Sequence, residues 1–143
     1  MTASRSRAAG RGTAGAAEIA LVVAVALVVW RLVLGWNWSV VPGRSANSYR
    51  DPHSGLDWVL VHLTAMAGVG WLALRGRAVV GVVVVVLPLV VLSGWRMAAA
   101  EVIGANMWPI GLAVLIFTLV LACTATAVVG AWLRRRRAPA RGR

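Results

Sequence analysis

The chain has 143 residues, 60% of them hydrophobic, and a mean hydropathy of +0.80. So apolar a composition in so short a chain excludes an ordinary soluble domain. The formal net charge of +11 comes from 15 basic residues, all arginine, which stand almost entirely at the ends of apolar runs and in the tails. Membrane topology explains this placement better than nucleic-acid binding does, so we predict no nucleic-acid partner.

The N-terminal part of the chain divides into a tail and a first apolar span. Residues 1–13 are mostly Ala, Gly, Ser, Thr and Arg, which predicts a disordered basic tail. The first membrane span is predicted at about 14–35. Its strictly uncharged run, from 19 to 30, is short for a bilayer crossing. We therefore expect Glu18 and Arg31 to lie near the two interfaces and to reach the headgroups.

Three further spans follow a long connection. Residues 36–55 hold several turn and breaker pairs and form a predicted outer loop. The later spans are predicted at about 56–74, 78–95 and 107–133, followed by a basic tail at 134–143. The second and third are joined by Arg75-Gly76-Arg77, a tight turn that makes them an antiparallel pair.

The distribution of arginines predicts the orientation. With both termini in the cytosol, the inner side holds eleven arginines and the outer side four. The sequence therefore predicts an all-α integral membrane four-helix bundle of the cytoplasmic membrane, with both termini cytosolic. The inner arginines are Arg5, Arg7, Arg11, Arg75, Arg77, Arg134, Arg135, Arg136, Arg137, Arg141 and Arg143, and the outer ones are Arg31, Arg44, Arg50 and Arg96.

Six of the eight tryptophans fall at the outer ends of the predicted spans, and two mark the inner boundary. Indole favours the headgroup region because its ring is apolar while its N–H needs a partner. One interpretation is an aromatic belt; the other is that some outer indoles line a pocket or contact a partner. The outer set is Trp30, Trp36, Trp38, Trp58, Trp95 and Trp108, and the inner pair is Trp71 and Trp132.

Polar residues gather on the same predicted side. They form either an ion-paired lid that joins helix ends or a vestibule that holds a ligand. We expect Arg31 to pair with Asp57, with Glu101 as its competitor, and His62 to bond across a helix interface. The candidate outer polar cluster is Arg31, Asp57, His62, Arg96, Glu101 and Asn106.

The sequence contains no motif for catalysis or for a cofactor. Cys123 is the single cysteine, so an internal disulfide and a CxxC redox pair are both excluded. The chain has no GxSxG, no phosphate-binding glycine loop followed by lysine, and no paired Cys/His spacing for zinc or haem. We therefore expect a protein that is not an enzyme and has no cofactor or metal.

Small residues recur at four-residue spacing, which favours close helix packing, either within the bundle or at an oligomer seam. In the last span they are Ala122, Thr126 and Gly130, and in the second they are Thr64 and Gly68.

The outer Gly35-Trp-Asn-Trp38 stretch and the Gly104-Ala-Asn-Met-Trp-Pro-Ile-Gly111 stretch resemble small four-span membrane proteins of GC-rich bacteria that carry no assigned activity. The resemblance implies the span layout and no function. We predict a non-enzymatic accessory or structural component, with the outer tryptophan-rich face as its working surface. The alternative is a small dimeric transporter of the multidrug-exporter type. Expected partners are the lipid bilayer and another membrane protein or a second copy of the chain.

Overall fold

The computed structural model describes residues 3–35, 41–42, 49–50, 53–99 and 108–137. Its helices are α1 (Ala3–Leu34), α2 (Gly55–Leu74), α3 (Ala78–Ala99) and α4 (Trp108–Arg137). Each contains a stretch long and apolar enough to cross a membrane. The predicted all-α four-helix bundle is confirmed, and the chain is a small multi-pass membrane protein.

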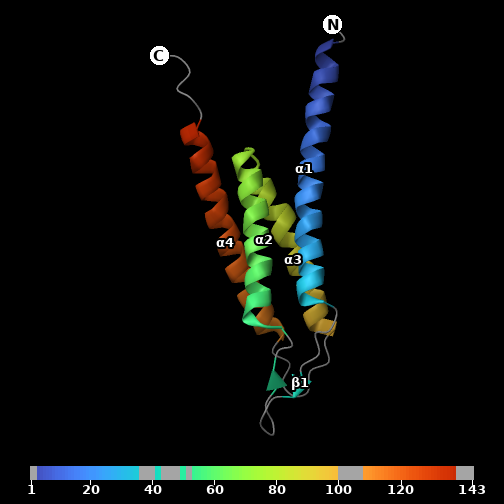
Figure 1. Cartoon of the computed structure of the whole chain (residues 1–143), viewed down its shortest axis with the longest axis vertical. Helices are drawn as coiled ribbons and strands as arrows, with labels where there is room; N and C mark the ends of the chain where they lie inside the picture. Colours follow the sequence, from blue (N-terminus) through green and yellow to red (C-terminus); the bar gives the residue numbers. More distant parts are fainter. Residues whose placement is uncertain (1–2, 36–40, 43–48, 51–52, 100–107, 138–143) are drawn as a thin grey trace.

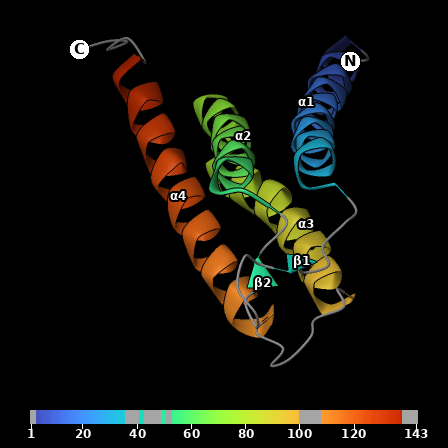
Figure 2. The ribbon, with the colours of Figure 1, turned by 60° about the horizontal axis from the view of Figure 1, so that its bottom comes forward.

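The α2–α3 pair forms the centre of the bundle, with α1 and α4 on either side (Figures 1 and 2). Both flanking helices contact α2 and α3, and no contact joins the described parts of α1 and α4 to each other. One end of the bundle contains the N-terminal end of α1, the α2–α3 turn and the C-terminal end of α4 (Figure 1). We call this the arginine end, and the opposite end, where the connection between α1 and α2 lies, the loop end.

Two helices extend into predicted tails. Helix α1 begins at Ala3, so it covers most of the segment 1–13 for which a basic tail is predicted. The segment contains three alanines and three arginines, which are among the best helix formers. At the other end of the chain α4 continues through Arg137, and the positive side chains of its last turn favour the helix C-terminus.

The predicted outer loop contains a short antiparallel pairing. Strand β1 (Val41–Pro42) lies beside β2 (Tyr49–Arg50), with Val41 opposite Arg50 and Pro42 opposite Tyr49. The end of α1 and the start of α2 lie within one residue of their predicted bounds, whereas α3 reaches Ala99 instead of 95.

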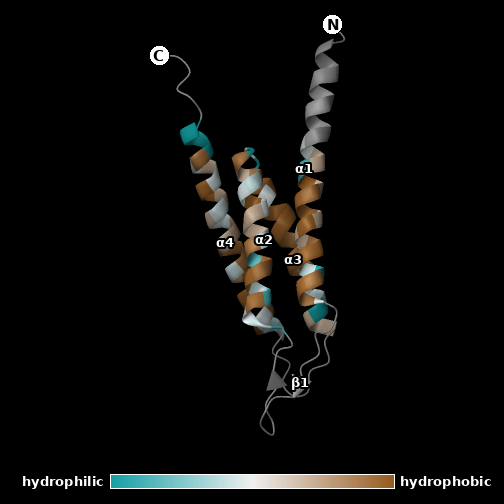
Figure 3. Cartoon of the chain, in the orientation of Figure 1, coloured by the Kyte–Doolittle hydropathy of each residue, from teal (hydrophilic) through white to brown (hydrophobic). Residues whose placement is uncertain are grey.

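The core is made of small and branched apolar side chains from all four helices. In α4 the buried residues recur every fourth position, at Leu115, Leu119, Cys123 and Ala127. A single buried stripe leaves most of this helix exposed, and that surface is strongly apolar (Figure 3). Such a surface suits hydrocarbon and not water.

The predicted packing residues lie at two different interfaces. A Cβ added to Gly130 would lie 2.8 Å from the Ala73 Cβ, so α4 and α2 approach closely there. A Cβ added to Gly68 would lie 2.6 Å from Val22 Cγ1 of α1.

The three other predicted packing residues are all half-buried. Thr126 lies in the α2–α4 interface, because a Cβ added to Gly70 would lie 3.2 Å from Thr126 Cγ2. The Thr126 hydroxyl donates to the Ala122 carbonyl at 2.8 Å, and the Thr64 hydroxyl donates to the Leu60 carbonyl at 2.9 Å.

The α2–α3 turn is closed by its own backbone. The Gly76 N–H donates to the Ala73 carbonyl at 2.9 Å, and the Arg77 N–H donates to the Leu72 carbonyl at 2.8 Å. This is a Schellman arrangement, in which the residue after the helix takes a left-handed conformation. Gly76 has φ +84°, which a side chain would strain.

Candidate functional site

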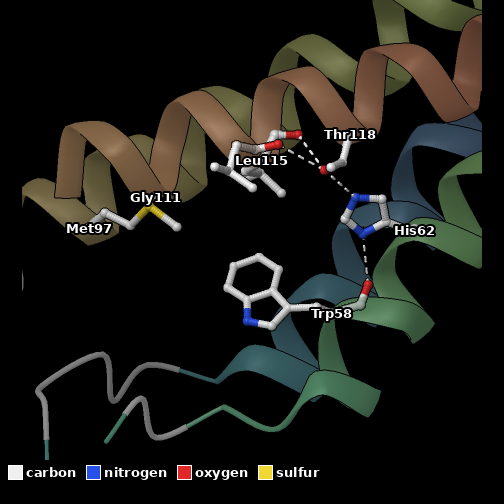
Figure 4. A pocket seen from close by; sticks show the side chains of 7 residues that line it. Trp58, His62, Met97, Gly111, Leu115 and Thr118 are labelled. Carbon is white, nitrogen blue, oxygen red and sulfur yellow. Dashed lines mark hydrogen bonds between the residues drawn. The ribbon is translucent and has the colours of Figure 1, made fainter. Parts of the chain in front are cut away.

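A pocket of about 360 Å³ lies at the loop end between α2, α3 and α4 (Figure 4). Its walls are mainly apolar, and its polar side chains come from α2 and α4. The volume falls within the range of small-molecule and side-chain pockets. The lining residues are Trp58, His62, Met97, Gly111, Val114, Leu115 and Thr118.

Both ring nitrogens of His62 are hydrogen-bonded, Nδ1 within its own helix α2 and Nε2 across to α4 (Figure 4). Its Nδ1 lies 2.8 Å from the Trp58 carbonyl oxygen, and its Nε2 lies 3.1 Å from Thr118 Oγ1. A carbonyl only accepts, so Nδ1 carries a hydrogen. The imidazole of His62 is therefore positioned by two bonds and forms a fixed wall of the pocket.

The Thr118 hydroxyl has two possible hydrogen-bonding arrangements. It lies 2.9 Å from the Val114 carbonyl and can donate there while accepting from a protonated His62 ring. With a neutral ring that keeps its hydrogen on Nδ1, the hydroxyl donates to Nε2 instead. The contact between α2 and α4 thus persists in either protonation state.

A second histidine, to which the sequence analysis assigned no role, caps α1. His53 Nε2 donates to the Leu34 carbonyl at 2.6 Å, and its ring packs edge-on against Trp58 with centroids 6.0 Å apart. The last carbonyls of a helix have no partner within it, so this bond satisfies one of them. The helix ends here because Gly35 adopts φ +62°. His53 therefore connects the finish of α1 to the pocket wall.

Asp57 is held at the start of α2, and the predicted pair with Arg31 is not formed. Its carboxylate accepts from the Ser54 N–H at 2.7 Å and from the Ser54 hydroxyl at 2.8 Å. The Asp57 N–H donates back to Ser54 Oγ at 3.3 Å, which completes a capping box. The Ser-x-x-Asp spacing from Ser54 to Asp57 is a signal that could have revealed this bond from sequence alone.

The outer tryptophans with described side chains, Trp30, Trp58 and Trp95, do not share one face. Trp30 is 3% exposed, and its indole N–H donates to the hydroxyl of buried Ser93 at 2.9 Å, joining α1 to α3. The Trp30 side chain therefore lies in the core and does not contribute to an aromatic belt. Trp95 is 58% exposed, with the Arg96 guanidinium 5.8 Å from its ring centroid.

The described residues of the predicted polar cluster contact different partners and do not form one group. Asp57 bonds Ser54, His62 bonds Thr118, and Arg96 lies beside Trp95. Arg31 is half-buried near the finish of α1. The remaining predicted residues of the two outer groups, Trp36, Trp38, Glu101 and Asn106, lie outside the described residues, as does the side chain of Trp108.

The ion pairs shown by the described side chains lie at the arginine end. Glu18 of α1 contacts Arg75 Nη1 at 3.2 Å and Arg77 Nη1 at 3.3 Å. Arg77 Nη1 also donates to the Gly15 carbonyl at 3.0 Å. Glu18 therefore fastens α1 to the α2–α3 turn, and its place near one membrane interface stays a prediction.

Within the part of the chain that the structure describes, no three His, Cys, Asp or Glu side chains gather into a possible metal site. Comparison with protein-family models, curated proteins and solved structures finds no match to this chain.

Proposed function

We propose that this membrane protein is a non-enzymatic accessory component of a membrane assembly, and that the loop-end pocket receives an apolar or aromatic side chain of a partner membrane protein. The observation that carries the proposal is the pocket itself. Met97, Val114 and Leu115 provide apolar walls, and methionine adapts its shape to an inserted group. Trp58 adds an indole, a side chain enriched at protein interfaces.

The bonding of the polar side chains supports a structural role. Both ring nitrogens of His62 are engaged by Trp58 and Thr118, so the pocket presents a fixed surface. The Trp30–Ser93 bond and the pairing of Glu18 with the turn likewise join helices to one another. A rigid scaffold of this kind suits the positioning of a partner.

Site-specific photocrosslinking of the full chain in its native membrane tests the proposal. A photoreactive residue at Gly111, which lines the pocket, should yield a discrete adduct with another protein. The matched control is the same residue at Val128, which is exposed on the same helix and does not line the pocket. Filling the pocket with Met97→Trp should remove the adduct.

Three results would contradict the assignment. The first is that the residue at Gly111 crosslinks only to lipid. The second is that Gly111 and Val128 give equal amounts of protein adduct. The third is that the adduct has twice the mass of the chain. The last would make the occupant a second copy of this chain.

The alternative function, a small dimeric transporter of the multidrug-exporter type, is favoured by one observation. His62 lines the pocket, and an imidazole within a membrane span is a side chain of the type that carries protons in transporters. A transporter should show a proton-coupled flux in liposomes that His62→Gln abolishes and that Thr64→Val leaves intact. An accessory protein should show no such flux in either form.

We also infer that the arginine end faces the cytosol and that the membrane is the cytoplasmic one. The support is the split of arginines between the two predicted sides, eleven against four. Reporter fusions at Arg143 and after Gly76 should report cytosol, and a fusion within 46–52 should report the exterior. An exterior signal from the Arg143 fusion would overturn the orientation.

A further inference from the structure

A second cavity, of about 310 Å³, lies at the arginine end between the α2–α3 turn and the last turns of α4. Three alanines and a glycine leave its interior open, and two arginine side chains contribute its charge. The lining residues are Ala73, Gly76, Ala78, Ala131, Arg134 and Arg135.

The backbone of the turn determines where one of these charges lies. A Cβ added at Gly76 would collide with the Arg134 guanidinium, so that guanidinium lies directly on the turn. The lack of a side chain at Gly76, whose φ is +84°, leaves room for this approach. Arg134 is therefore held over the α2–α3 turn, beside the cavity.

The charges at this end do not balance. Glu18 is the single carboxylate at the arginine end of the described structure, and it is engaged by Arg75 and Arg77. Arg134 and Arg135 form no ion pair with any carboxylate among the described residues. Two positive charges thus border a cavity that contains no negative group from the described part of the protein.

Exposed tryptophans indicate the depth of the cavity in the bilayer. Trp71 and Trp132 are about half exposed, and both lie at the arginine end. The Arg75 guanidinium lies 4.8 Å from the Trp71 ring centroid, and that of Arg136 lies 3.8 Å from the Trp132 centroid. Indoles with this combination of apolar ring and polar edge settle among lipid headgroups. The cavity is therefore at the level of lipid phosphates.

The start of α3 adds to the positive potential of the cavity. Ala78, its first residue, lines the cavity, and the first turn contains no acidic residue. The Gly81 N–H donates to the Arg77 carbonyl, which leaves the N–H groups of 78–80 without a partner inside the helix. These groups form the positive end of the helix dipole.

We propose that this cavity binds the phosphate group of an anionic phospholipid. Arg134 and Arg135 donate to the phosphate oxygens, and the alanine-lined interior accommodates the adjoining glycerol. Basic pockets between membrane helices recognise anionic headgroups in this way. The inference goes beyond the proposed function, which concerns the loop end, and does not depend on it.

Lipid titration of the full chain in detergent micelles tests the site. Phosphatidylglycerol should raise the melting temperature and remain bound in native mass spectrometry, whereas phosphatidylcholine should do neither. The double variant Arg134→Gln/Arg135→Gln should weaken phosphatidylglycerol binding about tenfold or more. The control Arg136→Gln/Arg137→Gln removes the same charge two residues further along α4. It should leave binding within about twofold of wild type.

Two results would overturn the lipid assignment. If inorganic phosphate at millimolar concentration produces the same rise in melting temperature, the ligand is a soluble anion. If both double variants lose binding equally, the net charge of this end attracts the lipid without a site.

A second variant keeps the test decisive if the double arginine variant does not fold. Ala131→Leu fills the cavity without changing charge and should abolish the preference for phosphatidylglycerol. Ala125→Leu places the same side chain on the exposed face of α4 and should preserve the preference. Retention of the preference by Ala131→Leu would show that the cavity is not the binding site.

Discussion

The two ends of the bundle are held together by different chemistry. At the loop end, polar side chains bond a carbonyl or hydroxyl of another element, as His53 does with Leu34, Trp30 with Ser93, and His62 with Thr118. At the arginine end, the six arginines whose side chains the structure describes accompany one described carboxylate, Glu18. The bonds at the loop end satisfy these three side chains within the protein, and the arginine end leaves positive charge for an external anion.

This difference has a consequence for stability. Hydrogen bonds between uncharged groups respond weakly to ionic strength, whereas ion pairs exposed at an interface are screened by salt. We therefore expect the contacts at the loop end to be independent of salt and lipid charge. The attachment of α1 at the arginine end should depend on both.

The largest expected effect is at the close approach of α4 to α2 near the arginine end. Gly130→Leu places a side chain against Ala73 and the Gly70 carbonyl, where a single Cβ is already too close. Overpacking typically costs about 1–3 kcal/mol, and rigid backbone on the opposing side puts this change at the upper end. Thermal unfolding in detergent measures it. Val129→Leu, on the exposed face, is the control, and equal tolerance of both changes would show that Gly130 does not face α2.

The next effect tests the loop end. Trp30→Phe removes the indole donor to Ser93 and opens space in the core between α1 and α3. We expect a loss of about 1–2 kcal/mol in the free energy of unfolding. The loss should be the same at low and high salt. Trp95→Phe, at an exposed indole, is the control and should change stability little. A larger loss of stability at Trp95 than at Trp30 would contradict the burial of Trp30.

A smaller effect is expected at the ion pairs of the arginine end. Glu18→Gln removes the partner of both Arg75 and Arg77, but these side chains are substantially exposed, so we expect about 0.5–1 kcal/mol. Unlike the change at Trp30, this loss should shrink as salt is raised. Melting temperatures at two ionic strengths measure it, with Arg137→Gln as the control. A loss that does not change with salt would mean that Glu18 acts through packing.

The smallest effect is the coupling across the pocket. A double-mutant cycle with His62→Ala and Thr118→Val isolates the bond between α2 and α4. Hydrogen bonds between membrane helices average about 0.6 kcal/mol in such cycles. Additive single effects would show that the two side chains do not stabilise each other.

Two features of the structure could be predicted from the sequence, because each depends only on residues that are close together along the chain. The capping box from Ser54 to Asp57 and the glycine turn at Gly76 are local patterns. The Trp30–Ser93 bond joins residues 63 positions apart. It depends on how α1 and α3 are rotated about their axes. Helix rotation is readable from sequence only when one face is distinctly polar, and both spans are apolar on nearly every side.

The sequence by itself determined the number of spans, their approximate bounds and the confinement of most charge to helix ends. Hydrocarbon accepts only long apolar segments whose backbone bonds are satisfied internally. The tertiary structure decided which side chains meet: Glu18 with Arg75 and Arg77, His62 with Thr118, and Arg134 with the turn at Gly76. In lipid, apolar faces are nearly equivalent, so close packing and a few polar bonds select the arrangement of the helices.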